Sequence, residues 1–378
     1  MIPLVDPGPV LEPERVERYS RQLMLPGFGE DAQRRLRAAR ILVVGAGGLG
    51  SAVVPILAAA GIGTIGIADD DVVELSNLHR QLSHGVADIG SRKTESLAQT
   101  VRAIDPDCRV ITHDVRLSAA NLPQILADYD LVIDGSDNFP TRYLVDDAAS
   151  LAGKPLVWGS ILRFQGQIGL SWEGRGPTYR DLFPSPPAPE DALSCELGGV
   201  LPSLCPAVGS FLATEAIKLI TGIGEPLIGR VLVYDALNAS TREIRYARPA
   251  DAVPVTELID YELFCGTSAD DDAAVSAAEL LARLRAGEEV ALIDVRESHE
   301  FSQRHIPGSI HLPVGDIENG RMPHRAPETI GELVVYCEQD PRSRRAVREL
   351  REHGITARYL AGGIRSFVEV GGGTANGE

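Results

Sequence analysis

The sequence has few of the features that mark secreted, membrane or nucleic-acid-binding proteins. It contains 5 cysteines in 378 residues, and no two of them have C-x-x-C spacing. This usage argues against a disulfide scaffold or a zinc knuckle. No apolar run approaches the roughly 20 residues that a membrane helix requires. Residues 1–13 lack the basic start and apolar centre of a signal peptide. We therefore expect a reduced, cytoplasmic protein that inserts into no membrane.

A surplus of basic residues is also missing. Lysine and arginine number 36 against 53 acidic residues, which gives a formal net charge of -17. This balance excludes a general nucleic-acid binder, because neutralising phosphates requires an excess of cations. The length exceeds one ordinary core and predicts two domains. We expect a first domain over residues 14–250, a linker over 251–275 and a second domain over 276–372.

A β-α-β unit with a glycine turn lies near the start of the chain. An apolar run from Arg40 leads into Gly45-Ala46-Gly47-Gly48-Leu49-Gly50, a helix-like stretch follows, and residues 63–69 form a second apolar run. The pattern G-x-G-x-x-G lets backbone N–H groups approach a phosphate at a helix N-terminus. Asp69 closes the second strand, where an acid can bond ribose hydroxyls. The unit predicts a bound nucleotide, and an NAD-dependent oxidoreductase stays possible at this point.

Alternating strands and helices continue along the chain and predict an α/β fold. Strands are expected at residues 109–112, 131–134 and 156–159, with possible antiparallel strands at 167–172 and 231–234. Strands that alternate with helices form mostly parallel sheets covered on both faces. A second α/β pattern begins at residue 276 and predicts a separate small domain.

Polar and cationic residues gather after the second strand. Asn77, Arg80, Gln81 and Lys93 follow Asp69 in order. A hydride-transfer site needs few such groups beside the phosphates. A site that cleaves ATP between its α- and β-phosphates uses cations to stabilise the departing pyrophosphate and a carboxylate to hold Mg²⁺.

Several ordered motifs then resemble a known family. RYSRQLMLPGFG, GAGGLGS, DDDVVELSNLHRQ, GSRKTES, DGSDNFPTRY, GGVLPSLCPAVG and ATEAIK are similar to those of E1-like activating enzymes of the HesA/MoeB/ThiF type, which adenylate sulfur carriers for molybdopterin and thiamine synthesis. The resemblance implies a Rossmann-like adenylation domain that uses ATP and Mg²⁺ on a ubiquitin-like carrier ending in Gly-Gly.

The resemblance also implies roles for individual residues. Arg21 would reach across a homodimer interface into the partner's ATP site. Arg163 and Gln165 would lie on the face that receives the carrier's glycine tail. Around the nucleotide, Gly45, Gly47, Gly48 and Gly50 would face the phosphates, Asp69 the ribose, Asn77, Arg80, Gln81 and Lys93 the triphosphate, and Asp137 would hold Mg²⁺.

The cysteines depart from the family pattern at one place and match it at another. Cys195 falls where the family carries a cysteine on a mobile loop, and we expect it to take the acyl group or to join a persulfide relay. Cys205 begins a helix, and we expect it to be a small buried filler. Relatives carry zinc on two C-x-x-C pairs, which would fall at residues 178–181 and after Pro249. Neither pair is present, so we predict no structural zinc.

The C-terminal region resembles a rhodanese domain over residues 276–370, on the motifs LIDVRESHEFSQRHIPGSIHLPV and VVYCEQDPRS. Cys337 and Arg342 form C-x-x-x-x-R between an apolar strand and a helix, which favours a thiolate or persulfide. The related phosphatases have one residue more between Cys and Arg, so sulfur transfer is preferred. Asp294 and Arg296 are expected to brace this loop.

The loop itself departs from the rhodanese pattern. Glu338 and Asp340 are acidic, and Pro341 lacks an N–H donor. Two carboxylates would raise the pKa of Cys337 and repel thiosulfate. Three interpretations stay open: a loop that takes sulfur from a protein persulfide supplied by a donor such as a cysteine desulfurase, a weakened loop, or an inactive docking module.

Overall fold

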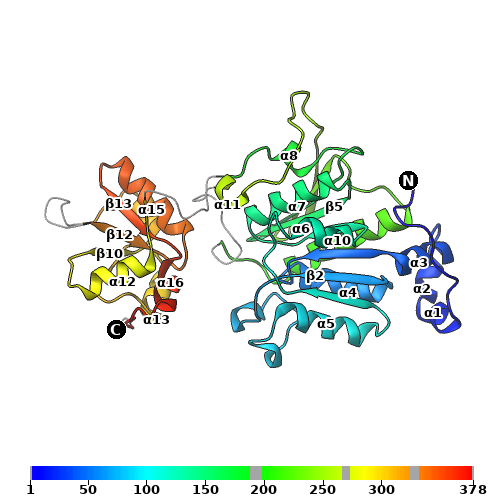
Figure 1. The fold of residues 1–378 in the computed structure, drawn as a ribbon, viewed down its shortest axis with the longest axis horizontal. Coiled ribbons are helices and arrows are strands. Elements are labelled where there is room, and N and C mark those ends of the chain that lie inside the picture. Colours follow the sequence, from blue (N-terminus) through cyan, green and yellow to red (C-terminus); the bar gives the residue numbers. More distant parts are fainter. Residues whose placement is uncertain (1, 188–197, 266–272, 324–331, 377–378) are drawn as a thin grey trace. The chain divides into compact units, whose positions relative to one another are not determined.

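The computed structural model describes residues 2–187, 198–265, 273–323 and 332–376. The chain separates into two compact units, one formed by Met1–Pro186 with Ser194–Tyr261 and the other by Pro187–Leu193 with Glu262–Glu378 (Figure 1). Each unit has its own sheet and its own hydrophobic core, so the two are described in turn.

The first unit is built on an eight-stranded sheet in the order β3-β2-β1-β4-β5-β6-β7-β8. From β3 to β5 neighbouring strands are parallel, and from β5 to β8 they are antiparallel. The central strands are buried almost throughout, as expected of parallel strands covered on both faces. The strands are β1 Arg40–Val44, β2 Thr64–Ala68, β3 Arg109–His113, β4 Leu131–Asp134, β5 Leu156–Leu162, β6 Gln165–Ser171, β7 Arg230–Asp235 and β8 Ser240–Arg245.

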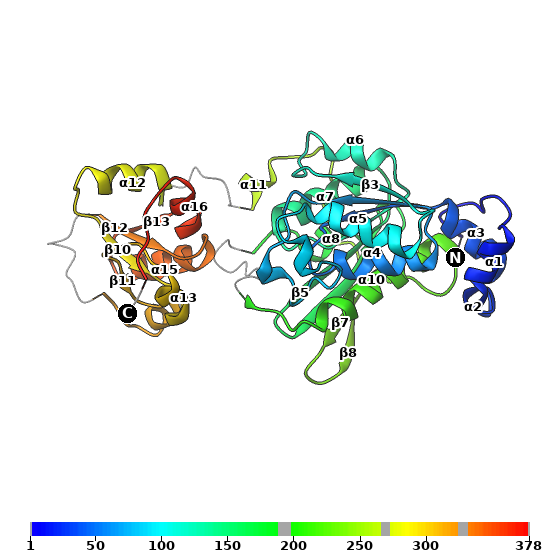
Figure 2. The ribbon, with the colours of Figure 1, turned by 90° about the horizontal axis from the view of Figure 1, so that it is seen from below.

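Helices cover both faces of this sheet. In Figure 1, α6 and α7 lie above it and α4 and α5 below it. Figures 1 and 2 both place α1, α2 and α3 together at the N-terminal end of the unit. The elements are α1 Pro13–Arg18, α2 Ser20–Leu23, α3 Gly29–Ala38, α4 Gly50–Ala60, η1 Leu75–Asn77, η2 Val86–Asp88, α5 Lys93–Ile104, α6 Leu122–Ala127, α7 Phe139–Leu151, α8 Tyr179–Leu182, α10 Leu204–Thr221 and α11 Tyr261–Phe264.

Local sequence explains where the main helices begin and end. Asn138 caps α7, since its side-chain oxygen accepts from the backbone N–H of Thr141 at 2.9 Å. Helices α4 and α10 both end at glycines in the left-handed conformation, Gly61 and Gly222. Helix α10 is the one described helix long and apolar enough to cross a membrane, but 61% of it is buried. It packs against α4, β5 and α3, which is the position of a core helix.

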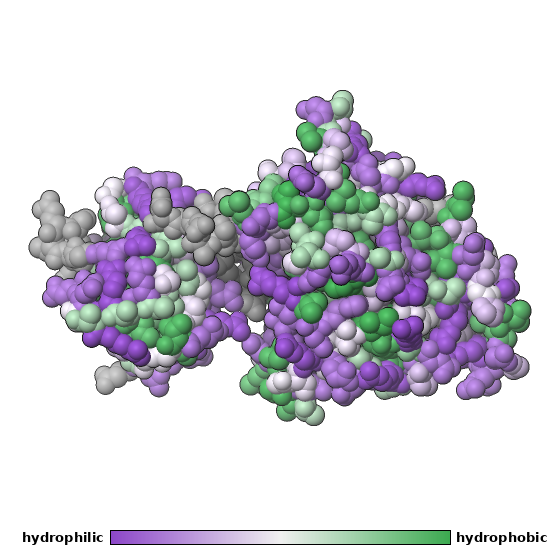
Figure 3. Space-filling model, in the orientation of Figure 1, coloured by the Kyte–Doolittle hydropathy of each residue, from purple (hydrophilic) through white to green (hydrophobic). Residues whose placement is uncertain are grey.

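The antiparallel part of the sheet ends in the β7–β8 hairpin, which protrudes from the first unit. Figure 3 shows hydrophobic atoms among hydrophilic ones on this hairpin. Leu237, in its turn, is 67% exposed. The predicted antiparallel strands near residues 167–172 and 231–234 are confirmed as β6 and β7, whereas β8 was not predicted.

The second unit is a parallel five-stranded sheet in the order β11-β10-β12-β13-β9. One face is covered by α12 and α16 and the other by α14 and α15 (Figure 2). The elements are β9 Ala274–Val275, α12 Ala277–Arg285, β10 Ala291–Asp294, α13 Ser298–Gln303, β11 Ile310–His311, α14 Val314–Glu318, β12 Leu333–Tyr336, α15 Pro341–Glu352, β13 Ala357–Leu360 and α16 Gly363–Glu369. The predicted α/β class is confirmed for both units.

Candidate functional sites

The glycine loop joins β1 to α4 and is packed too closely for side chains. Gly45 has φ +87°, a left-handed conformation that favours glycine. A Cβ on Gly50 would lie 1.8 Å from the carbonyl oxygen of Gly45, and one on Gly48 would lie 2.9 Å from the Sγ of Cys205. The loop therefore presents backbone N–H groups at the first turn of α4, as a phosphate site requires.

Asp69, at the end of β2, holds this loop in place. Its carboxylate accepts from the backbone N–H of Ala46 at 2.7 Å and from that of Asp71 at 2.8 Å. Burial raises the pKa of Asp69, and the positive charge of Lys93 opposes that shift. Each oxygen keeps a second lone pair, so the ribose role predicted for Asp69 is compatible with these bonds.

The predicted triphosphate residues lie at the same end of the sheet and differ in their hydrogen-bond partners. Lys93, the first residue of α5, is buried and its Nζ lies 2.7 Å from Asp71 Oδ2. Gln81 is buried beside Gly47, and its Oε1 has no partner among the described residues. Asn77 is also buried, and its Oδ1 accepts from the backbone N–H of Glu74. Polar groups thus surround the glycine loop.

Arg80 and Arg21 are the two other cations predicted to act at the nucleotide site. Arg80 donates to the carbonyl of Ser76 at 3.0 Å, and its charge lowers the pKa of Cys205 against the effect of burial, which raises that pKa to about 11. Because Cys205 contacts Gly48, Arg80 lies near the loop. The predicted burial of Cys205 is confirmed. Arg21 is exposed on α2, and a single chain does not test its predicted role across a dimer.

The DGSDN segment follows β4 beside the glycine loop. Asp134 is fully buried, which raises its pKa, and it accepts from the backbone N–H of Ser136 at 2.9 Å. Asp137 is exposed. Arg142, which the sequence analysis passed over, is buried on α7 with its Nε 4.0 Å from Asp134 Oδ2. That separation exceeds a hydrogen bond, and both atoms lack hydrogen-bond partners among the described residues.

Residues 179–180, in a segment where the sequence analysis found no C-x-x-C pair, are joined to other elements by an ion pair and hydrogen bonds. Arg180 donates to Asp147 through Nε at 2.6 Å and Nη2 at 2.7 Å, and the Tyr261 hydroxyl donates to the same carboxylate at 2.6 Å. Asp146 accepts from the backbone N–H groups of Tyr179 and Arg180. We call this set, Asp146, Asp147, Arg180 and Tyr261, the polar clamp. It ties residues 179–180 to α7 and to the start of α11.

A second connection strengthens the same region. Arg248 Nη1 donates to Glu173 at 2.6 Å, and its Nε lies 3.9 Å from Asp181. The stretch that begins near Pro249 is therefore connected to the segment at Tyr179 by charged side chains of the chain itself.

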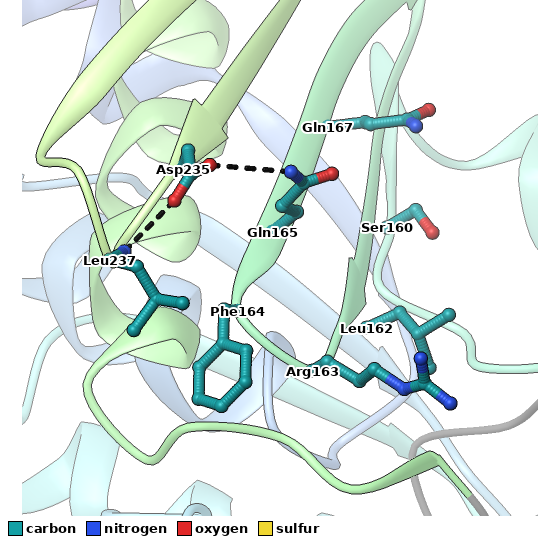
Figure 4. Close-up of a pocket in the computed structure, with 8 residues that line it drawn as sticks. All are labelled: Ser160, Leu162, Arg163, Phe164, Gln165, Gln167, Asp235 and Leu237. Carbon is teal, nitrogen blue, oxygen red and sulfur yellow. Dashed lines mark hydrogen bonds between the residues drawn. The ribbon is translucent and has the colours of Figure 1, made fainter.

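A pocket of about 410 Å³ opens on the antiparallel part of the sheet (Figure 4). Gln165 Nε2 donates to Asp235 at 3.4 Å across the β6–β7 pair. Arg163 sits in the β5–β6 turn with φ +55°, and its backbone pairs with Gly199 and Leu201. The pocket combines polar and apolar groups: Ser160, Leu162, Arg163, Phe164, Gln165, Gln167, Asp235 and Leu237. Cys195 lies outside the described residues.

The loop that begins at Cys337 joins β12 to α15 in the second unit. Cys337 is fully buried, which raises the pKa of its thiol, whereas Ser343 and the charge of Arg342 lower it. Its Sγ lies 3.5 Å from the Ser343 hydroxyl. Gly363, with φ +60°, packs so closely that a Cβ there would lie 2.5 Å from the Cys337 carbonyl oxygen. The thiol is enclosed by a tightly fitted backbone.

Both carboxylates of this loop accept hydrogen bonds from neighbouring groups. Glu338 accepts from Arg296 Nη1 at 2.9 Å and from Arg304. Asp340 accepts from the backbone N–H of Gly362 at 2.7 Å. Glu338 therefore has two arginine partners and Asp340 a backbone donor, which tempers the repulsion of an incoming anion that the sequence predicts. Burial is the largest cause of the raised pKa of Cys337.

Arg296 braces the loop as predicted. It donates to Asp294 from Nε and Nη2 and to Glu338 from Nη1, and its side chain is 1% exposed. On the other side, Arg342 donates to both oxygens of Glu300 at 2.6 and 2.8 Å.

The glycine loop of the first unit presents backbone N–H groups to a phosphate, and the second unit encloses a thiol. The first site suits nucleotidyl transfer and the second suits sulfur transfer. Such a combination defines a two-domain adenylyltransferase and sulfurtransferase. The chain belongs to the ThiF family, which it matches over residues 19–255, and it carries a rhodanese-like domain over residues 276–369. This membership supports the adenylating interpretation of the glycine loop over the oxidoreductase.

Curated relatives agree with the two-domain layout. A probable adenylyltransferase/sulfurtransferase MoeZ of Mycobacterium tuberculosis is 49% identical, over 97% of this chain and 96% of its own length. An adenylyltransferase and sulfurtransferase MOCS3 of Drosophila virilis is 39% identical, over 95% of this chain and 84% of its own. A sulfur carrier protein adenylyltransferase of Thermus thermophilus is 47% identical over 67% of this chain and 97% of its own.

Solved structures share the fold of the first unit. MccB of E. coli with a modified MccA peptide has a TM-score of 0.57 at 21% identity, covering 63% of this chain and 75% of that one. PaaA has a TM-score of 0.54 at 24% identity, covering 64% and 76%.

Proposed function

We propose that the first unit adenylates the C-terminal glycine of a ubiquitin-like sulfur carrier that ends in Gly-Gly. The observation that carries this proposal is the glycine loop, closed to side chains at Gly50 and flanked by buried Lys93 and Gln81. The relatives' names point to the same carrier chemistry. The carrier carboxylate attacks the α-phosphate of ATP, which gives an acyl-adenylate and pyrophosphate, and Lys93 stabilises the charge on the departing pyrophosphate.

Magnesium fits the carboxylates at this site. Asp137 is exposed at the end of β4, and ligand atoms of Asp69, Asp70 and Asp71 lie within 4.8 Å of one another. Carboxylate oxygens are the donors that Mg²⁺ takes alongside phosphates. We assign Asp137 as the ligand, and the ion would neutralise phosphate charge.

We propose that the pocket beside β6 receives the carrier's tail. Gln165, Gln167 and Asp235 offer hydrogen bonds to an extended peptide, and exposed Phe164 and Leu237 offer apolar contacts. Two glycines suit such a site, since they let a backbone pass close to the sheet.

We propose a homodimer in which Arg21 completes the partner's nucleotide site. Arg21 is exposed, and Met24 and Leu25, which follow it, are 74% and 52% exposed. Exposed apolar side chains also flank the nucleotide site at Leu75, Leu82 and Val86. Apolar groups of this kind are typical of surfaces that a second subunit covers.

For sulfur transfer we propose that Cys337 takes a sulfane sulfur from a persulfide donor such as a cysteine desulfurase. The terminal sulfur then attacks the acyl-adenylate, an acyl disulfide forms, and AMP leaves. A second thiol, for which Cys195 is the candidate, attacks Cys337 and releases the carrier thiocarboxylate, and a cellular thiol resets the resulting disulfide. Glu338 and Asp340 both accept hydrogen bonds from neighbouring groups, and this supports the interpretation that the loop is active. Both reactions suit the reducing cytoplasm, where we place the protein.

Intact-mass spectrometry of a carrier ending in Gly-Gly tests this function. With enzyme, ATP, Mg²⁺ and a persulfide donor, the carrier should gain about 16 mass units as oxygen is exchanged for sulfur. The Cys337→Ala variant should form AMP without that gain. If wild-type enzyme forms AMP but gives no gain with any donor, the second unit is a docking module. If it forms no AMP with several carriers, the adenylation proposal is wrong.

A further inference from the structure

The charges around Cys337 are balanced within the second unit. Three arginines near the loop are paired with carboxylates of the same unit. The arginines are Arg296, Arg304 and Arg342, and the carboxylates are Asp294, Glu300 and Glu338. A carboxylate therefore offsets each of these three positive charges and weakens the attraction that it exerts on an incoming anion.

Arg342 is the cation whose charge acts on the thiol. It lowers the pKa of Cys337 in opposition to burial. Its two terminal nitrogens are both taken by Glu300, and its Nε is buried without a hydrogen-bond partner among the described residues. The charge that could attract an anion toward Cys337 is thus shared with a carboxylate.

Glu300 belongs to a different element from the loop and is itself held in place. It lies on α13, where its Oε2 also accepts from the backbone N–H of Glu297 at 3.0 Å. Despite burial, Arg342 and that N–H keep the pKa of Glu300 below its usual value. Glu300 is therefore ionised at neutral pH and fixed by three hydrogen bonds.

We propose that Glu300 determines which sulfur donor Cys337 accepts: by neutralising Arg342 it makes the loop reject small anionic donors such as thiosulfate and take sulfur from a persulfide carried by a docked protein. This rests on the proposed sulfur transfer. The Cys337 thiolate attacks the outer sulfur of the donor persulfide, the donor's S–S bond breaks, and the donor leaves as a thiolate. With thiosulfate the same attack would release sulfite. A protein donor gains its affinity from docking, whereas thiosulfate, a dianion, depends on local charge.

The test uses the full-length chain and its Glu300→Gln variant, which removes one charge and keeps an acceptor for Arg342. Persulfide formed at Cys337 is measured by peptide mass spectrometry, with thiosulfate or a persulfide-loaded cysteine desulfurase as donor. We expect the rate with thiosulfate, relative to the protein donor, to rise about tenfold in Glu300→Gln. Glu318→Gln, which removes the same charge from the Arg345 pair of this unit, should leave the ratio unchanged.

A second measurement separates this inference from the proposed function. Alkylation of Cys337 by anionic iodoacetate and by neutral iodoacetamide is followed across pH. Glu300→Gln should raise the iodoacetate-to-iodoacetamide ratio and move the Cys337 profile to lower pH, because the charge of Arg342 is uncovered. ATP–pyrophosphate exchange should stay at the wild-type level.

The outcomes are distinct. If alkylation responds but neither donor loads wild-type Cys337, Glu300 controls the loop's charge and the sulfur-transfer proposal is wrong. If the protein donor loads Cys337 but neither ratio changes in Glu300→Gln, the inference about Glu300 is wrong. A Cys337 that reacts with no reagent in either protein would also overturn it.

Discussion

The nucleotide crevice and the Cys337 loop use charge in opposite ways. Around the glycine loop, Gln81 Oε1, Asp134 Oδ2 and Arg142 Nε are buried without partners among the described residues. Around Cys337, the carboxylates accept from the terminal nitrogens of the arginines, although Arg342 Nε is buried without a partner among the described residues. Unpaired buried polar groups destabilise a fold, so a site keeps them where a charged ligand supplies the missing bonds. The unpaired groups of the crevice suit a charged ligand, whereas the charged groups around Cys337 pair mainly with one another.

This contrast predicts where mutations affect stability and where they affect activity. In the sulfur loop, removing a charge should destabilise the fold because its partner is left buried and unpaired. In the crevice, removing a charge should reduce activity while the fold survives. The following predictions test this division, beginning with the largest expected effect.

Arg296→Ala should destabilise the second unit by about 3–5 kcal/mol, because buried Asp294 and half-buried Glu338 lose their main partner. Chemical denaturation monitored by hydrogen exchange in residues 276–369 would measure this. Arg321→Ala, which breaks an exposed pair with Asp316, should change stability by less than about 0.5 kcal/mol. Equal effects of the two substitutions would contradict the division.

Lys93→Ala should lower ATP–pyrophosphate exchange about 10²–10³-fold, or about 2.7–4 kcal/mol, because a placed cation beside the departing phosphates is lost. The melting temperature should change little, since the partner Asp71 is exposed and becomes solvated. Arg102→Ala removes a cation from the exposed face of the same helix and should leave exchange unchanged. A large fall in stability with normal exchange would reverse the assignment of Lys93.

Much of this contrast could be anticipated from the sequence, and part of it could not. The glycine loop, Asp69 and the two strands that flank the loop follow from one local β-α-β pattern, so the sequence predicted them. Cys337 and Arg342 are likewise close in sequence. Periodicity and turn residues carry this information because the interacting groups are near neighbours along the chain.

The pairings that decide the chemistry join residues far apart in the sequence. Glu338 meets Arg296, 42 residues away, and Arg180 meets Asp147, 33 residues away. Nothing local determines which side chain a carboxylate will contact, so the sequence predicted repulsion of thiosulfate by Glu338 and did not predict its pairing with Arg296. Arg142 was overlooked for a similar reason: it lies in the FPTRY stretch that follows DGSDN, but its burial depends on the packing of α7.

The polar clamp extends the comparison to a third place, where internal pairs join residues 179–180 to α7 and to Tyr261. Arg180→Ala should destabilise the first unit by about 1–3 kcal/mol, because nearly buried Asp147 then keeps only the hydroxyl of Tyr261. Arg245→Ala, on the exposed hairpin strand, serves as the control. A metal chelator should leave the melting temperature of the wild type unchanged, and a large fall on chelation would show that a metal shares this role.

The last effect, which appears only as the pH changes, is a pH dependence at the clamp. Burial raises the pKa of Asp146 to about 7, whereas an unfolded aspartate titrates near 3.9. Between about pH 4 and 7 the folded protein holds a proton that the unfolded chain has lost, so this carboxyl group lowers stability as the pH rises, by at most about 1.4 kcal/mol per pH unit. Asp146→Asn keeps an acceptor for the backbone N–H groups of Tyr179 and Arg180 but cannot titrate. Its free energy of unfolding, measured by denaturant at pH 5 and pH 7, should therefore fall less over that interval than the wild-type value. An identical fall in both proteins would mean that Asp146 titrates alike in the folded and unfolded states.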